Sequence, residues 1–113
     1  MGAIIIDDIR FNFSDDRLYQ HMAAGVQHVL VDGGSFVMSG DDTTSVLVNP
    51  YRFVKFDHGD AARLELNDEW VRAIVQVLKH THRTALIPEE SGARAALESI
   101  DKTLAELSEG DQG

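Results

Sequence analysis

The chain has 113 residues, of which 43% are hydrophobic and 26% charged, and its 10 Lys and Arg against 19 Asp and Glu give a formal charge of −9. This length suits one domain with a hydrophobic core of its own. The lack of cysteine excludes disulfides, thiolate nucleophiles and cysteine-ligated metals, and it favours a reducing, cytoplasmic setting. No apolar run approaches the roughly 20 residues of a membrane span, and the first residues lack the pattern of a secretory signal.

The first quarter of the chain predicts a strand followed by a short helix. Apolar and polar residues alternate strictly over residues 9–13, and residues 4–6 extend this strand across an interruption or bulge. Ser14 before two aspartates marks a helix start, because its hydroxyl can accept a free amide and the carboxylates favour the positive end of the helix dipole. Apolar residues four apart then predict a helix over residues 15–24 that ends at Gly25.

The middle of the chain predicts two antiparallel hairpins with a strand between them. The turn of the first hairpin is Asp32-Gly33-Gly34, whose glycines tolerate positive φ. The turn of the second hairpin spans residues 57–60, and Asn49-Pro50 ends the strand between the hairpins. The predicted strands comprise residues 27–31 and 35–38 of the first hairpin, the single strand 43–48, and residues 52–56 and 62–66 of the second hairpin.

The last third of the chain predicts two helices. Asn67 caps the first helix, which carries acidic residues in its first turn and basic residues in its last turn, up to Arg83. Its single tryptophan, Trp70, is predicted to be a core residue rather than a binding anchor. The second helix spans residues 88–107 and has a narrow apolar seam that packs on its own domain or on a second copy. The seam residues, a candidate interface, are Leu97, Ile100, Leu104 and Leu107.

These elements predict an α+β fold. An antiparallel sheet of about five strands, built from a strand, a short helix and two hairpins, carries two C-terminal helices packed on it. We expect one domain over residues 1–107, followed by a flexible polar tail over residues 108–113.

Catalytic and metal-binding patterns are weak in this sequence. His80 and His82 are two residues apart on a helix and point away from each other, unlike the i, i+4 pair that binds a metal. His58 is flanked by aspartates and is a candidate general base, but aspartates at turns more often bind their own backbone. We therefore predict no catalytic residue, no metal site and no cofactor.

The excess of acidic over basic residues is the main basis of the functional hypothesis. No basic stripe is present, so direct binding to nucleic acid or to an anionic membrane is not expected. A negative field instead speeds encounter with a basic protein. We predict a non-catalytic protein-binding module for a basic partner, similar in size and acid balance to small inhibitor, immunity and phage accessory proteins. The candidate acidic surface comprises Asp41, Asp42, Asp57 and Asp60.

Two alternatives remain open at the level of the sequence. The chain could be a structural subunit of a homo-oligomer or of a larger phage or cellular assembly, joined through the apolar seam of the last helix and through exposed sheet edges. It could also be a small-molecule-binding domain, with the ligand between the sheet and the helix that carries Trp70.

Overall fold

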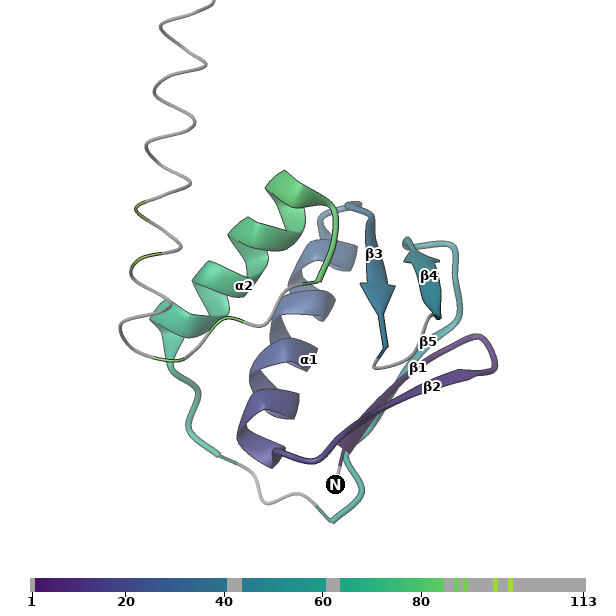
Figure 1. Cartoon of the computed structure of the whole chain (residues 1–113), viewed down its shortest axis with the longest axis horizontal. Coiled ribbons are helices and arrows are strands. Elements are labelled where there is room, and N and C mark those ends of the chain that lie inside the picture. The colour runs from purple at the N-terminus through teal and green to yellow at the C-terminus, as the bar shows by residue number, and fades with distance from the viewer. Residues whose placement is uncertain are drawn as a thin grey trace, which may run out of the picture.

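The computed structural model describes residues 2–40, 44–60 and 64–84, together with residues 87, 89, 95 and 98. Five strands and two helices follow in order: β1 (Gly2–Ile6), β2 (Ile9–Phe13), α1 (Asp16–Val31), β3 (Phe36–Ser39), β4 (Ser45–Val48), β5 (Val54–Asp57) and α2 (Asp68–Thr81). The paired strands are antiparallel, which confirms the predicted α+β class. Helix α1 lies between α2 and the strands (Figure 1), and its buried side chains belong to the hydrophobic core.

The five strands form two sheets rather than one. β1 is the middle strand of a sheet in the order β2-β1-β5, and β3 pairs with β4 in a second sheet. The segment after α2 lies along β3, where the N–H of Val37 donates to the carbonyl of His82 (2.7 Å) and the N–H of Thr84 donates to the carbonyl of Val37 (3.0 Å). One edge of β3 is therefore covered.

The strand predicted over residues 9–13 is confirmed, but residues 4–6 do not extend it. They belong to β1, which folds back on β2 through a two-residue turn that begins at Asp7. Asp7 has a φ of 54°, as the first position of a type II′ hairpin turn requires. Its carboxylate accepts hydrogen bonds from the N–H of Phe53 (3.2 Å) and from Arg52 (2.8 Å). These contacts hold the turn against the segment that precedes β5.

Helix α1 is longer than predicted, because it passes through Gly25 and ends only at Val31. Its cap is Asp15 rather than Ser14, since the Asp15 carboxylate accepts from the N–H groups of Arg17 (2.9 Å) and Leu18 (3.3 Å). The helix start was therefore predicted within one residue, whereas the helix end was wrong.

The first predicted hairpin is wrong, because its first arm is the last part of α1. The glycines of its supposed turn end the helix instead. Gly33 has a φ of 84°, its N–H donates to the carbonyl of Leu30 (3.0 Å), and the N–H of Gly34 donates to the carbonyl of Val29 (2.9 Å). This pair of hydrogen bonds is the Schellman motif. The true partner of β3 is β4, with Ser39 opposite Ser45.

Gly25 occupies the point where α2 packs closely on α1. A Cβ atom at this position would lie 2.6 Å from Cγ2 of Ile74, which is closer than van der Waals contact allows. Glycine in a helix interior costs about 1 kcal/mol relative to alanine. That cost is tolerated here because the missing side chain lets the two helices approach.

Gly25→Ala is expected to lower the free energy of unfolding by about 1–3 kcal/mol, as overpacked core substitutions do. Urea denaturation would measure the change. Ile74→Ala removes the obstructing methyl group, so the double variant should be less destabilised than the sum of the two single variants. Strictly additive effects, or a stabilising Gly25→Ala, would contradict the close helix contact.

The start of α2 was predicted correctly, whereas its end was predicted too late, because the helix ends at Thr81 with His82 as its cap. The side-chain oxygen of Asn67 caps it by accepting from the N–H groups of Glu69 (3.1 Å) and Trp70 (3.3 Å). The Trp70 side chain is buried, with 5% of its surface exposed, and its indole N–H donates to the carbonyl of Ile87 (2.8 Å). The predicted core role of Trp70 is therefore confirmed.

The second predicted hairpin is also wrong, because β5 pairs with β1, from Ala3 opposite Asp57 to Ile6 opposite Val54. Residues 64–66 of its second arm form no strand, and residues 62–63 lie outside the described residues. The predicted helix over residues 88–107 also lies outside them, except for residues 89, 95 and 98, of which 95 and 98 are helical. The predicted tail over residues 108–113 lies outside them entirely.

Candidate functional site

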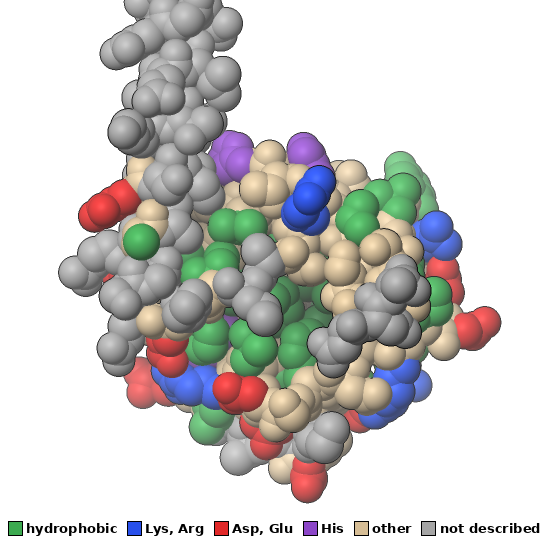
Figure 2. Space-filling model, viewed as in Figure 1, with side chains coloured by type: hydrophobic (Ala, Val, Ile, Leu, Met, Phe, Trp, Pro, Cys, Tyr) green, Lys and Arg blue, Asp and Glu red, His purple; other side chains and the backbone are tan. Residues whose placement is uncertain are grey.

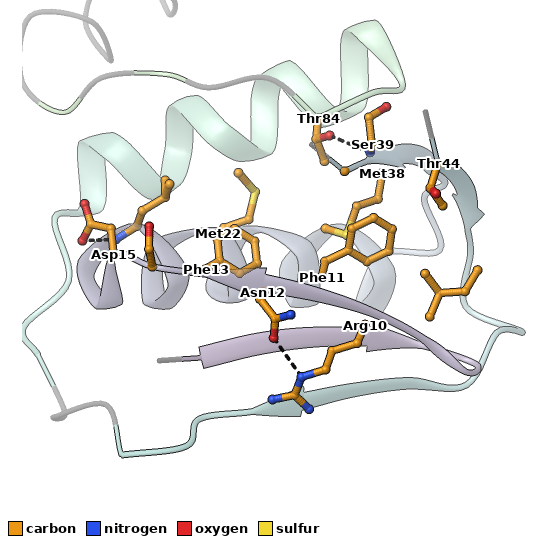
Figure 3. A pocket seen from close by; sticks show the side chains of 14 residues that line it. Arg10, Phe11, Asn12, Phe13, Asp15, Met22, Met38, Ser39, Thr44 and Thr84 are labelled. Carbon is orange, nitrogen blue, oxygen red and sulfur yellow. Dashed lines mark hydrogen bonds between the residues drawn. The ribbon is translucent and has the colours of Figure 1, made fainter. Parts of the chain in front are cut away.

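A cleft with a volume of about 680 Å³ opens beside β2. β2 forms one wall, the end of β3 together with Thr84 forms another, and α1 forms the floor (Figure 3). The floor is apolar and the rim is polar, a composition typical of ligand sites in proteins. Figure 2 shows hydrophobic side chains in the hollow at the centre of this face. The described lining residues are Ile9, Arg10, Phe11, Asn12, Phe13, Ser14, Asp15, Leu18, Met22, Met38, Ser39, Gly40, Thr44 and Thr84.

The wall formed by β2 is a free sheet edge. β2 is the outer strand of the β2-β1-β5 sheet, and no other strand of the described chain pairs with it. The register shows which groups face outward, because the N–H of Asp7 continues the β1–β5 ladder by donating to the carbonyl of Phe53 (2.8 Å). Odd residues of β1 therefore bond to β5 and even residues bond to β2. The residues of β2 opposite these even residues are 9, 11 and 13, and they bond to β1. The backbone N–H and C=O groups of Arg10 and Asn12 therefore point away from β1.

The two faces of β2 differ in chemistry. Phe11 and Phe13 point toward α1, whereas Arg10 and Asn12 lie on the opposite face of the sheet (Figure 3). Phe11 is nearly buried, and the ring of Phe13 packs against the ring of Tyr19 with centroids 5.7 Å apart. The alternation over residues 9–13 predicted this division into faces. The free edge was missed, because the sequence does not show which strands pair with β1.

Of the predicted acidic surface, only Asp57 and Asp60 lie among the described residues. Asp57 forms an ion pair with Arg10 across the sheet (3.0 Å). The hydrogen bond from Arg10, followed by that from the N–H of Gly59, holds the pKa of Asp57 below its usual value. Asp60 is exposed in the turn after β5. Asp41 and Asp42, like the seam residues Leu97, Ile100, Leu104 and Leu107, lie outside the described residues.

A second group of acidic residues lies where the two helices begin. The helices run parallel, since the N–H of Asn67 at the start of α2 donates to His21 near the start of α1 (2.8 Å), and Lys79 at the end of α2 pairs with Asp32 at the end of α1 (3.0 Å). Their N-termini therefore lie together and carry the acidic residues that helix dipoles favour. These residues are Asp15, Asp16, Asp68 and Glu69. Asp15 also lines the cleft.

A closed ring of hydrogen bonds joins this end of the helices to the C-terminal segment. The guanidinium of Arg17 donates twice to the carboxylate of Glu89 (2.7 and 2.5 Å), and the side-chain amide of Asn67 donates to the same carboxylate (3.0 Å). His21 completes the ring by contacting the carbonyl of Arg17 (2.7 Å) and the N–H of Asn67 (2.8 Å). These contacts fix residue 89 beside the start of α1, next to the Asp15 end of the cleft.

The ring gives the stability of the protein a defined pH dependence. The hydrogen bonds from Arg17 and then Asn67 lower the pKa of Glu89 from 4.5 to about 2. A carboxyl group with a lowered folded-state pKa stabilises the fold above its unfolded-state pKa, and this contribution is lost as the pH falls through the folded-state pKa. Glu89→Gln should therefore be less stable than the natural chain at neutral pH, and the difference should disappear between pH 4.5 and pH 2.

Thermal unfolding of both chains across this pH range would measure the effect. Glu65→Gln is the matched control, because Glu65 is exposed and forms no ion pair within the described residues. A stability difference for Glu89→Gln that is constant with pH would contradict the assigned contacts.

The structure does not support His58 as a base held by a neighbouring carboxylate. The carboxylate of Asp57 binds Arg10 and the N–H of Gly59 (3.0 Å). Nδ1 of His58 instead lies 3.0 Å from the hydroxyl of Tyr19. Burial, and then the charge of Asp57, raises the pKa of Tyr19, so this hydroxyl stays protonated at neutral pH. The pair is a packing contact at the end of the sheet.

No group of three or more His, Asp or Glu side chains among the described residues could hold a metal ion. Neither α1 nor α2 has the length and apolar composition needed to cross a membrane. The cleft beside β2 is a feature of the described surface that could receive another molecule.

Comparison with known proteins adds no further assignment. No protein-family model, no curated protein and no solved structure matches this chain. The features of the chain that bear on its function are therefore the α+β fold, the free edge of β2 and the composition of the cleft.

Proposed function

We propose that the chain is a non-catalytic protein-binding module, and that the cleft receives a segment of a basic partner protein. The observation that carries this proposal is the free edge of β2 along a cleft with an apolar floor. Sheet edges with unpaired backbone groups are the surfaces on which proteins bind extended segments of other chains. The apolar floor supplies the burial that such contacts need for affinity.

The charge distribution supports a basic partner. The whole chain carries a formal charge of −9, and four of its cationic side chains are already bound by carboxylates. These four are Arg10, Arg17, Arg52 and Lys79. Asp15, at the N-terminus of α1, lines one end of the cleft, so its charge there attracts a positive group. An inhibitor, immunity or phage accessory protein would use such a field to cover a basic surface.

A display selection with random peptides on the immobilised chain would test the proposal. We expect selected peptides to be rich in Lys and Arg and to bind more weakly at high salt, because salt screens exposed charges. Ser39→Trp places a bulky side chain at the β3 rim of the cleft. This variant should weaken peptide binding by about tenfold or more, because it prevents one large apolar side chain of the peptide from being buried. Such burial contributes roughly 1.5–3 kcal/mol, and about 1.4 kcal/mol corresponds to a tenfold change in Kd.

Ser35→Trp is the matched control, since Ser35 is also an exposed serine beside β3 but does not line the cleft. It should bind like the natural chain. Equal binding to Ser39→Trp and Ser35→Trp would place the contact elsewhere. A selection that enriches no peptide would contradict the proposed function.

A small-molecule site is the second candidate, because the cleft volume of about 680 Å³ lies within the range of ligand pockets. No described residue of α2, the helix that carries Trp70, lines this cleft. Thermal unfolding against a panel of metabolites and nucleotides would test this candidate. A ligand that raises Tm for the natural chain but not for Ser39→Trp would favour it over peptide binding.

A further inference from the structure

The edge of β2 lacks the features that usually prevent strand addition. Natural sheet edges are protected by proline, by bulges or by charged side chains placed on the edge. The β1–β2 register is regular from Ile9 to Phe13, and β2 contains no proline. Its only cation, Arg10, is turned across the sheet, where it donates to Asn12 (2.8 Å) and to Asp57 (3.0 Å). The polar side chains of β2 therefore bind each other on the outer face and leave the edge open.

The neighbouring edge of the second sheet shows the opposite arrangement. Along β3, both the N–H and the carbonyl of Val37 form hydrogen bonds with the backbone of residues 82–84. The N–H of Ser39 donates to the hydroxyl of Thr84 (3.3 Å). β3 thus has a strand-like segment of its own chain on this edge. β2, on the other side of the same cleft, has no such partner among the described residues.

Building on the proposed function, we propose that the partner segment binds as an added antiparallel strand along β2. The outward N–H and C=O groups of Arg10 and Asn12 form the ladder. The added strand would become the fourth strand of the β2-β1-β5 sheet, in the same antiparallel sense as its present pairs. Recognition of this kind takes affinity from the backbone and specificity from alternate side chains.

The walls of the cleft define which side chains fit. A residue opposite Phe11 shares its face and points toward the floor, where Met22 and Met38 lie. Flexible thioether side chains adapt to leucine, methionine or phenylalanine alike. A residue opposite Phe13 comes next to Asp15, and it suits lysine or arginine. In an antiparallel strand the basic residue comes first, so the partner pattern is basic, any residue, large apolar residue.

A synthetic peptide with the order lysine-threonine-leucine-threonine-valine tests this pattern with the natural chain. When the peptide lies with its lysine opposite Phe13, its two threonines exchange backbone hydrogen bonds with Asn12 and Arg10. The N–H of the leucine then points away from β2. N-methylation of either threonine should weaken binding by about tenfold, the equivalent of one or two lost hydrogen bonds. N-methylation of the leucine should leave binding unchanged. Replacing leucine by aspartate should abolish it, and reversing the residue order should weaken it.

Asn12→Pro tests the same contact from the side of the protein. Proline removes the N–H of residue 12, one of the two outward N–H groups of β2, together with the side-chain contact to Arg10. It is tolerated on strand edges. Binding should fall about tenfold or more, whereas Asn12→Thr, which loses the same side-chain contact to Arg10 but keeps the N–H, should bind normally. Circular dichroism would check that both variants fold. If Asn12→Pro does not fold, the N-methylated peptides with the natural chain decide the question.

Each failure has its own meaning. If the threonine-methylated peptides bind as well as the leucine-methylated peptide, strand addition is wrong, although the cleft remains a protein-binding site. If selected peptides bind in the cleft but the designed peptide does not, the residue pattern is wrong. If light scattering shows a dimer that Asn12→Pro converts to monomer, the occupant is a second copy, which overturns the peptide assignment. If nothing binds in the cleft, the proposed function falls as well.

Discussion

Trp70→Ala is expected to lower the free energy of unfolding by about 3–5 kcal/mol, as other large core truncations do. This loss approaches the whole stability of a small domain, which is about 5–15 kcal/mol. The indole is 5% exposed, its ring stacks on that of His21 with centroids 4.4 Å apart, and its N–H binds the carbonyl of Ile87 (2.8 Å). Its removal leaves a cavity between α1, α2 and the C-terminal segment. Urea denaturation followed by circular dichroism would measure the effect.

Two further variants separate the causes of this loss. Trp70→Phe keeps an aromatic ring but removes the indole N–H, so it should cost less than the alanine variant. Arg72→Ala lies on the exposed side of the same helix and should change stability by less than about 0.5 kcal/mol. A Trp70→Ala chain as stable as Arg72→Ala would show that the indole is not part of the core.

Local signals predicted α2 well, because its sequence and its packing agree. Asn67 can accept the free N–H groups, the charges follow the helix dipole, and the apolar face matches the core. The same agreement holds for β2, where alternation and burial coincide. Elements of this kind depend little on distant residues, so the sequence alone predicts them.

The end of α1 could not be predicted in the same way. Val29 and Val31 are β-branched and favour strands locally, and Gly33-Gly34 suits a hairpin turn as well as a helix end. Packing decides between them: Val29 is fully buried in the core, and Gly25 lets α2 approach. These contacts involve residues far away in the chain, and they override local propensity.

The candidate site was beyond sequence analysis for the same reason. Phe11, Met22, Met38 and Thr84 belong to four separate segments, and the cleft exists only because β1, not β2, takes the central place in its sheet. The sequence also did not show which carboxylates are paired with cations. Asp57 was expected on an acidic surface, but Arg10 binds it across the sheet. Only the fold reveals which carboxylates remain to attract a partner.

The structure also changes how the acidic composition is interpreted. Asp15 and Asn67 cap parallel helices, and the acidic residues beside them stabilise the helix starts. This local role places negative charge at one end of the cleft. Under the proposed function, Asp15 would both cap α1 and attract the partner, so charge reversal at Asp15 would affect both stability and binding. Binding tests should for this reason alter the cleft rim at Ser39 and the β2 edge at Asn12 instead.

His21→Leu is expected to lower the free energy of unfolding by about 2–4 kcal/mol, from an unsatisfied buried amide and a lost aromatic contact. His21 is fully buried, and its two ring nitrogens face the carbonyl of Arg17 and the N–H of Asn67. A carbonyl only accepts and an amide N–H only donates, so Nδ1 carries the proton and Nε2 accepts. Leucine is similar in size but can satisfy neither group. Urea denaturation at neutral pH would measure the loss.

His28→Leu is the matched control, because His28 lies on the same helix with an exposed side chain, and it should change stability by less than about 0.5 kcal/mol. The hydrogen-bond ring predicts a second result. His21 positions Asn67, and Asn67 binds Glu89, so His21→Leu and Glu89→Gln should be non-additive in a double-mutant cycle. Additive effects would mean that His21 contributes only through packing on Trp70, and that the C-terminal segment is held independently of the helix caps.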